Sequence, residues 1–136
     1  MSKSIPTIQK YMTTSPYSIG KDQTVAAADK IMKENKIRHL PVQEDNKLIG
    51  IISERDVKFL QSFKDVDPTK VTIDSMYVDE VFTVEPDALL NEVCDVMAEN
   101  KYGCTLITSN GKLVGIFTWV DALRAMSELL NTRLKV

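Results

Sequence analysis

Two short motifs carry the residue types with the clearest chemical potential. The sequence contains GIISERD and, later, GIFTWVD, and in each a hydroxyl residue is followed three positions later by an aspartate. The hydroxyl residues are Ser53 and Thr118, and the aspartates are Asp56 and Asp121. Each motif follows an apolar run and precedes a helical pattern, so a strand is expected to end where a helix begins.

These motifs support two interpretations. In the structural one, a Ser or Thr followed three residues later by an acid forms a capping box, and the acid also meets the positive end of the helix dipole. In the functional one, backbone N–H groups and the hydroxyl bind phosphate. The aspartate, one turn further on the same helix face, then accepts the two hydroxyl groups of a ribose. Capping and ligand binding can coexist in one motif.

Nothing else in the sequence predicts catalysis or a metal site. His39 is the only histidine, Cys94 and Cys104 have no paired base in the sequence, and glycine-rich phosphate loops are absent. Two cysteines make neither a disulfide framework nor a zinc site. We expect two reduced, packed thiols, no catalytic residue, no bound metal and no required cofactor. For His39, a partly exposed surface position and a pH-sensitive role both remain open.

Composition narrows the class of protein. The 136 residues are 43% hydrophobic and 26% charged, which is typical of a soluble globular domain. A net charge of −2 and dispersed basic residues argue against nucleic acid or an acidic membrane as partner. The first residues lack the apolar core of a signal peptide, and no apolar run approaches the length of a membrane span. We therefore expect a cytoplasmic protein.

The elements that position the motifs occur twice, because the chain is a tandem repeat. An offset of 65 positions aligns the halves without a gap, so that Met32 falls on Met97 and Gly50 on Gly115. Each half reads strand, helix, strand, strand, helix. The predicted elements are extended pieces at 17–19 and 82–84, helices from about 25 and 90, hairpins of 40–42 with 48–52 and 105–107 with 113–117, and closing helices at 54–63 and 119–130.

Finer local features follow from the same pattern. Asp22 and Asp87 stand where they could cap the first helix of each half. Turn residues at 44–46 and 109–111 close the two hairpins. Apolar residues at a spacing of three and four predict the buried face of each first helix, namely Val25, Ala28, Ile31 and Met32, matched by Leu90, Val93, Val96 and Met97.

The predicted fold class is α+β. We place repeat 1 at residues 5–64, a polar linker containing Pro68 at 65–70, repeat 2 at 71–130 and a tail at 131–136. One repeat of this size buries too little surface to be comfortably stable alone. We therefore expect the two units to pack sheet to sheet about a pseudo-twofold axis, which would create two related clefts.

The chain from about Ile5 to Leu130 resembles a tandem pair of cystathionine-β-synthase (CBS) domains, a stand-alone Bateman-type module. The resemblance rests on the doubled element order and on phrases such as YMTTSPYSI, VAAADKIM, IRHLPV and KLIGIISERDV. It implies a regulatory module that binds adenosine-containing ligands in clefts between the repeats. The resemblance assigns phosphate to the motif hydroxyls, ribose to the motif aspartates, adenine to the first short strands, and further phosphate contacts to basic residues before the second strands. The implied nucleotide-binding residues are Ser18, Ile19, Arg38, His39, Ser53, Arg55, Asp56, Thr83, Val84, Thr118 and Asp121.

The halves differ in their basic residues. Arg38 and His39 correspond to Gly103 and Cys104, and the pair Glu54-Arg55 corresponds to Trp119-Val120. By analogy with the family, Arg38 and His39 reach the phosphate held by the motif of the other repeat. The resemblance therefore predicts unequal affinities at the two clefts, without deciding which is higher.

The favoured function is a sensor that binds AMP, ADP or ATP, or less readily S-adenosylmethionine or NAD, and signals to a separate, unidentified protein. The alternative is a dimerisation or interaction module that binds no nucleotide. In the family, paired domains join into a disc-shaped homodimer, which is also in keeping with the prevalence of twofold oligomers. Candidates for that surface are Leu60, Phe63, Met126, Leu129 and Leu130, which could equally be core residues.

Overall fold

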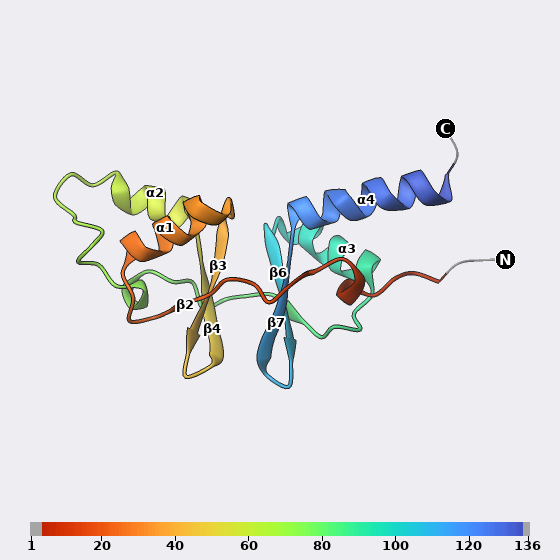
Figure 1. Cartoon of the computed structure of the whole chain (residues 1–136), viewed down its shortest axis with the longest axis horizontal. Coiled ribbons are helices and arrows are strands. Elements are labelled where there is room, and N and C mark those ends of the chain that lie inside the picture. The colour runs from red at the N-terminus through yellow and green to blue at the C-terminus, as the bar shows by residue number, and fades with distance from the viewer. Residues whose placement is uncertain (1–3, 135–136) are drawn as a thin grey trace. The chain divides into compact units, whose positions relative to one another are not determined.

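The computed structural model describes residues 4–134, which form two compact units (Figure 1). One unit is Tyr17–Val81, and the other combines the segment up to Pro16 with the chain from Phe82 onward. Each unit contains both helices and a sheet, so the α+β fold class is confirmed. Among the described residues, no helix combines the length and apolar character needed to cross a membrane.

The unit Tyr17–Val81 holds a three-stranded sheet with strand order β2-β3-β4. Strand β2 runs parallel to β3, and β3 is antiparallel to β4. The helices α1 and α2 lie together on one face of this sheet (Figure 1). The elements are β2 (Ile19–Gly20), α1 (Val25–Asn35), β3 (His39–Glu44), β4 (Lys47–Ser53), α2 (Glu54–Gln61) and the 3-10 helix η2 (Ile73–Ser75).

The other unit repeats this plan with one added strand, in the order β1-β7-β6-β5. Strand β5 is parallel to β6, whereas β7 is antiparallel to both β6 and β1. The elements are the 3-10 helix η1 (Ile8–Lys10), β1 (Thr13–Thr14), β5 (Thr83–Val84), α3 (Leu90–Asn100), β6 (Cys104–Ser109), β7 (Lys112–Thr118) and α4 (Trp119–Arg133). The doubled order of strand, helix, strand, strand, helix is therefore confirmed.

Both predicted hairpins are present and turn through left-handed residues. Asp45 and Asn46 have φ values of 50° and 64°, and Asn110 and Gly111 have values of 54° and 78°. Two consecutive positive φ values are the signature of a type I′ turn, whose twist matches that of the flanking strands. These turns, together with an irregularity in the pairing between Val42 and Gln43 or between Ile107 and Thr108, set the register that brings the start of β3 or β6 opposite the end of β4 or β7.

The helix starts differ from the prediction that Asp22 and Asp87 are caps. Helix α1 is capped by Thr24, whose hydroxyl accepts a hydrogen bond from the Ala27 N–H at 3.1 Å, and α3 begins after Leu89 without a side-chain cap. The prediction was wrong because each helix starts three residues beyond the aspartate. A capping side chain must stand immediately before the first helical residue.

Each unit has its own apolar core, built on the predicted helix faces. Val25, Ala28 and Met32 of α1 are buried, and Ile31 is only partly so. In the other unit, α3 buries the equivalent set of Leu90, Val93 and Met97, with Val96 half-buried. Residues of the closing helices complete both cores, so Leu60 and Leu129 pack inward and the core interpretation holds for these two.

The compact units do not coincide with the repeats of the sequence, because the two repeats exchange their opening segments. The Leu90 N–H donates to the Pro6 carbonyl at 3.0 Å, so the start of repeat 1 caps α3 of repeat 2. The equivalent bond, from the Val25 N–H to the Val71 carbonyl at 2.8 Å, caps α1 with the start of repeat 2. The boundaries at 5–64 and 71–130 therefore describe the repeats of the sequence rather than the compact units.

The expected linker and tail are partly structured. The Pro68 carbonyl accepts a hydrogen bond from the Ala26 N–H at 3.1 Å, so the linker contributes to the start of α1. Helix α4 continues to Arg133, three residues into the segment predicted as a tail, and residues 135–136 lie outside the described part of the chain.

Candidate functional site

The first motif stands at the junction of β4 and α2. Ser53 ends the strand, and its hydroxyl accepts a hydrogen bond from the Asp56 N–H at 3.3 Å. Asp56 Oδ2 accepts hydrogen bonds from the Ser53 N–H and from Ser53 Oγ, both at 2.9 Å. This is a complete capping box, so the structural interpretation of the motif is confirmed.

The second motif repeats this geometry between β7 and α4. Thr118 Oγ1 accepts a hydrogen bond from the Asp121 N–H at 3.5 Å. Asp121 Oδ2 accepts one from the Thr118 N–H at 2.9 Å and one from Thr118 Oγ1 at 3.2 Å. In both motifs one carboxylate oxygen orders the helix start, which leaves the other oxygen, Oδ1, for further contacts.

The motifs differ at Oδ1. In the second motif, Asp121 Oδ1 accepts a hydrogen bond from Thr13 Oγ1 at 3.0 Å and lies 4.0 Å from a guanidinium nitrogen of Arg124. The 65-residue offset places Val78 and Phe59 at the corresponding positions of the first motif, and neither side chain can donate such a bond. Among the described residues, no hydrogen bond reaches Asp56 Oδ1. Asp121 is only 6% exposed, whereas Asp56 is half-buried.

Thr13 is the site residue that the sequence did not reveal. It comes from β1, in the exchanged opening segment, and reaches an aspartate 108 positions further along the chain. Only the exchange of segments brings the two side chains together. A partial signal was available, because the gapless repeat places a threonine at 13 and a valine at 78.

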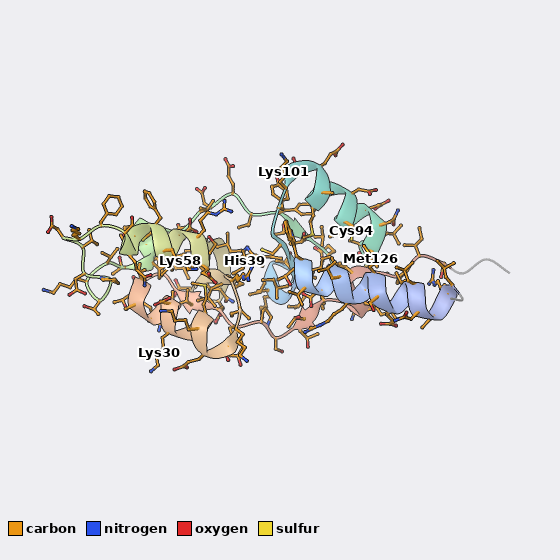
Figure 2. All side chains as sticks on the ribbon, turned by 90° about the horizontal axis from the view of Figure 1, so that it is seen from above. Lys30, His39, Lys58, Cys94, Lys101 and Met126 are labelled. Carbon is orange, nitrogen blue, oxygen red and sulfur yellow. The ribbon has the colours of Figure 1, made fainter. Side chains whose placement is uncertain are left out.

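Arg38 and His39 lie beside the first motif, at the start of β3. His39 is directly opposite Ser53 in the antiparallel ladder, and the Glu54 N–H donates to the Arg38 carbonyl at 2.8 Å (Figure 2 labels His39). Burial lowers the pKa of His39 below its ordinary value, and the neighbouring Arg38 charge lowers it further. The Asp56 and Glu54 carboxylates oppose both effects. The assignment of Arg38 and His39 to the phosphate of the other motif stays a prediction.

The charged residues of the first turn of α2 differ in their contacts. Glu54 forms an ion pair with Lys58 at 2.6 Å, and this contact lowers the pKa of Glu54. Arg55 is exposed, between Glu54 and the motif aspartate. Its guanidinium is therefore accessible to an anion from solvent.

The positions of the second motif that correspond to Arg38, His39, Glu54 and Arg55 carry no charge, since they are Gly103, Cys104, Trp119 and Val120. Cys104 is opposite Thr118 in the ladder, and burial raises the pKa of its thiol to about 12. Trp119, which is 63% exposed, donates its indole N–H to the Tyr102 carbonyl at 2.9 Å. The Tyr102 ring in turn lies 5.7 Å from the Phe82 ring, centroid to centroid. At position 119 an exposed indole therefore stands where the first motif has the carboxylate of Glu54.

The first short strands pair with β3 and β6 two to four residues beyond the positions opposite Ser53 and Thr118, toward the hairpin turns. Ile19 pairs with Val42 of β3, and its side chain is buried in the core, whereas Ser18 is exposed. Thr83 is likewise exposed, and Val84 packs partly against the other core. The Ile19 side chain is buried, so only the backbone of this residue is free to contact a ligand, whereas the half-buried Val84 keeps part of its side chain accessible.

The described residues contain no cluster of three or more His, Cys, Asp or Glu side chains that could hold a metal ion. The chemistry of both motifs is therefore that of hydrogen-bond donors at a helix N-terminus, a hydroxyl and a carboxylate. Such a set suits a ligand that combines an anionic group with neighbouring hydroxyl groups.

Comparisons with known proteins identify the family. The pattern that defines the CBS domain matches residues 8–61 and 73–128. Hypoxic response protein 1 of Mycobacterium tuberculosis is 28% identical over 123 residues, which cover 90% of this chain and 86% of that protein. The crystal structure of a Vibrio cholerae protein assigned to acetoin utilization (AcuB) has a TM-score of 0.87 and 28% identity, and the match covers 96% of each chain.

Two further crystal structures share the fold and contain ligands. CBSX2 in complex with AMP has a TM-score of 0.82 at 24% identity, over 91% of this chain and 98% of that one. The CBS domain pair of protein MJ0100, in complex with 5′-methylthioadenosine and S-adenosyl-L-methionine, has a TM-score of 0.82 at 23% identity, over 92% and 98% of the two chains. The two matched regions of sequence include both motifs, each at the end of its own domain. The chain therefore belongs to the CBS domain family and carries two copies of the domain in tandem.

Proposed function

We propose that this protein is a regulatory module that binds an adenosine-containing ligand through its two motifs. The observation that carries the proposal is the shared geometry of Asp56 and Asp121. Each uses one oxygen to order a helix start and holds its second oxygen beside that helix N-terminus. The carboxylate can then accept hydrogen bonds from the sugar hydroxyls. The backbone N–H groups and the hydroxyl beside it can bind the phosphate.

The remaining site residues have complementary roles in this proposal. Ser53 and Thr118 contact phosphate, and the backbones at Ser18-Ile19 and Thr83-Val84 contact adenine. Three basic side chains supply charge for a phosphate group, namely Arg38, His39 and Arg55. Because all three come from the first repeat, ligand binding at the two motifs is unequal.

The ligand class follows from the same chemistry. AMP, ADP and ATP combine a ribose diol with an anionic tail, and they are the preferred candidates, ahead of S-adenosylmethionine and NAD. The complexes of CBSX2 with AMP and of the MJ0100 pair with S-adenosyl-L-methionine support an adenosine compound. No catalytic role is proposed. The protein acts in the cytoplasm, where ligand binding shifts its conformational equilibrium and signals to a separate protein.

Thermal unfolding of the protein against AMP, ADP, ATP, S-adenosylmethionine and NAD tests the proposal. A ligand present at about 100 times its Kd adds roughly 2.7 kcal/mol to the free energy of unfolding. At this chain length that gain raises Tm by several degrees. We expect one subset of the panel to raise Tm, and calorimetry to give a Kd for each active compound.

The matched variants are Asp56→Ala and Asp121→Ala, alone and combined. The double variant should lose the ligand-induced rise in Tm. Ser75→Ala, a serine of η2 outside both motifs, should keep it. An unchanged ligand response in the double variant would refute the ribose assignment, even if the unliganded protein is less stable.

Self-association is a second candidate function, favoured by the outer face of α4. Leu123, Met126 and Leu130 are 62%, 56% and 49% exposed and recur at helical spacing (Met126 is labelled in Figure 2). Of the predicted dimer residues, Phe63 is also exposed, at 49%. We propose a homodimer in which this face is covered by a second copy. Sedimentation velocity should give a dimer for the wild type and a monomer for Leu123→Glu/Met126→Glu, and a monomeric wild type would refute the dimer.

A further inference from the structure

The two motif aspartates offer different numbers of acceptor positions to a ligand. A carboxylate has about four acceptor positions, two on each oxygen. In both motifs Oδ2 already accepts two hydrogen bonds, from the N–H and the hydroxyl of the capping residue. Binding a ribose through both of its neighbouring hydroxyl groups requires two more positions, and while the capping hydroxyl donates to Oδ2 both must come from Oδ1. When that hydroxyl turns to donate to a phosphate instead, it frees one position on Oδ2 in both motifs alike, so the difference between the motifs still lies at Oδ1.

Within residues 4–134, no hydrogen bond occupies either position of Asp56 Oδ1, whereas Thr13 occupies one of the two on Asp121 Oδ1. Thr13 Oγ1 donates to Asp121 Oδ1 at 3.0 Å, and Arg124 lies 4.0 Å from the same oxygen. At the corresponding positions of the first motif, Val78 and Phe59 contribute no donor. The Thr13 hydroxyl thus occupies a position that a ribose hydroxyl would need.

We propose that Thr13 determines the ribose affinity of the second motif: its hydroxyl acts as an internal competitor for Asp121, so the Ser53–Asp56 motif is the higher-affinity site for an adenosine-containing ligand. This inference rests on the proposed function and deepens it by ranking the two motifs. A ligand at the second motif binds Asp121 through one sugar hydroxyl, or else displaces Thr13 and loses a hydrogen bond already made.

The segment exchange makes this competition specific to one motif. The Val78 N–H and carbonyl both pair with Ile51 of β4, and Thr13 pairs with Ile116 at the corresponding position of β7. The two side chains therefore occupy equivalent places, one on each opening segment. Exchanging the two residue types, as Thr13→Val and Val78→Thr, is a reciprocal test in which each motif serves as the control for the other.

The experiment measures AMP, ATP and S-adenosylmethionine binding by calorimetry to the wild type, Thr13→Val and Val78→Thr. The second motif is isolated in the Asp56→Asn background, where the single tryptophan, Trp119, gives a fluorescence signal next to Thr118. We expect Thr13→Val to tighten binding there by about 5-fold, the equivalent of one net hydrogen bond. Val78→Thr should weaken the tighter site of the otherwise wild-type protein by a similar factor.

Two further readouts separate competition from general damage. Thr14→Val, on the same short strand and exposed, should change neither affinity. The preference for AMP over 2′-deoxy-AMP at the second motif should increase in Thr13→Val, because a second sugar hydroxyl can then reach Asp121.

The outcomes also separate this inference from the proposed function. If Thr13→Val leaves binding at the second motif unchanged or weaker, the role of Thr13 is refuted and the proposed function stands. If the wild type binds two ligands with equal affinity, the role of Thr13 and the inequality expected from the basic residues are both refuted, and the binding of an adenosine-containing ligand stands. If neither the wild type nor Thr13→Val binds any of the three compounds, both are refuted.

Discussion

Gly50 of β4 lies against the ring of Tyr77, in the segment that repeat 2 contributes to the unit of repeat 1. A Cβ atom at position 50 would overlap the Tyr77 ring and lie 2.5 Å from the Val78 carbonyl oxygen. The glycine that opens each motif is therefore a contact point for the exchanged segment. Gly115 has the same relationship to Met12, whose sulfur would lie 2.5 Å from an added Cβ.

Gly50→Ala should lower the free energy of unfolding by roughly 1–3 kcal/mol, the usual cost of overpacking. The obstacle is a ring and a backbone carbonyl, which cannot move aside cheaply. Gly115→Ala should cost less, because the Met12 side chain is flexible. Gly20→Ala is the matched control, since its nearest contact would be 3.9 Å away. Urea unfolding measures all three, and equal stability of Gly50→Ala and Gly20→Ala would contradict this account.

Thr24→Ala should destabilise the protein by about 1 kcal/mol, the typical cost of losing an N-cap side chain. The reason is the hydrogen bond that the Thr24 hydroxyl accepts from the Ala27 N–H. Asp22→Ala, which removes the exposed aspartate that the sequence pattern favoured as the cap, should leave stability nearly unchanged. The comparison is made by chemical denaturation, and a larger loss for Asp22→Ala would restore the original assignment.

The stability of the protein should fall as the pH drops from about 7 to 5.5, and His39 should account for the change. Burial holds the pKa of His39 below its ordinary value of 6.5. Between pH 7 and 5.5 the unfolded chain therefore binds more protons than the folded one. The stability that the neutral form of His39 allows is lost as the pH falls toward and through the lowered pKa of His39. Since His39 is the only histidine, His39→Gln should flatten this part of the profile. A wild-type profile already flat over the range would contradict the prediction.

Cys104 should react very slowly with thiol reagents in the folded protein. Burial raises the pKa of its thiol to about 12, and the thiolate is the reactive species, so at pH 8 very little of the thiol is ionised. Cys94, also half-buried, has a pKa raised by burial and by Asp95, and it serves as the internal comparison. Mass spectrometry of iodoacetamide-treated protein should find Cys104 labelled last, and both cysteines labelled alike in denaturant. Rapid labelling of Cys104 in the native protein would count against its burial.

Local pattern was sufficient to predict much of this fold. The apolar spacing that identified α1 and α3, the β-branched runs of the hairpins and the Asp-Asn and Asn-Gly turns all act within a few residues. The capping boxes at Ser53 and Thr118 were predictable for the same reason, because a side chain three residues away can reach the helix start. The helix caps at 22 and 87 were wrong by a few residues, since several polar residues near a helix start satisfy the same pattern.

The predicted α+β class and the family are confirmed, whereas the sheet-to-sheet arrangement about a pseudo-twofold axis and the ligand roles of the eleven site residues stay predictions. The sequence also could not rank the two motifs, because Thr13 makes its contact with Asp121 through a segment from the opposite repeat.

Residue patterns only a few positions long determine the doubled element order, the hairpins and the paired hydroxyl–aspartate motifs. These features could therefore be predicted directly from the sequence. Which opening segment completes which unit, and which aspartate oxygen is already occupied, depend on contacts between residues about 25 to 110 positions apart. Such contacts leave no periodic trace in a single sequence. They follow from the shape of the assembled core, where Pro6 reaches Leu90 and Thr13 reaches Asp121.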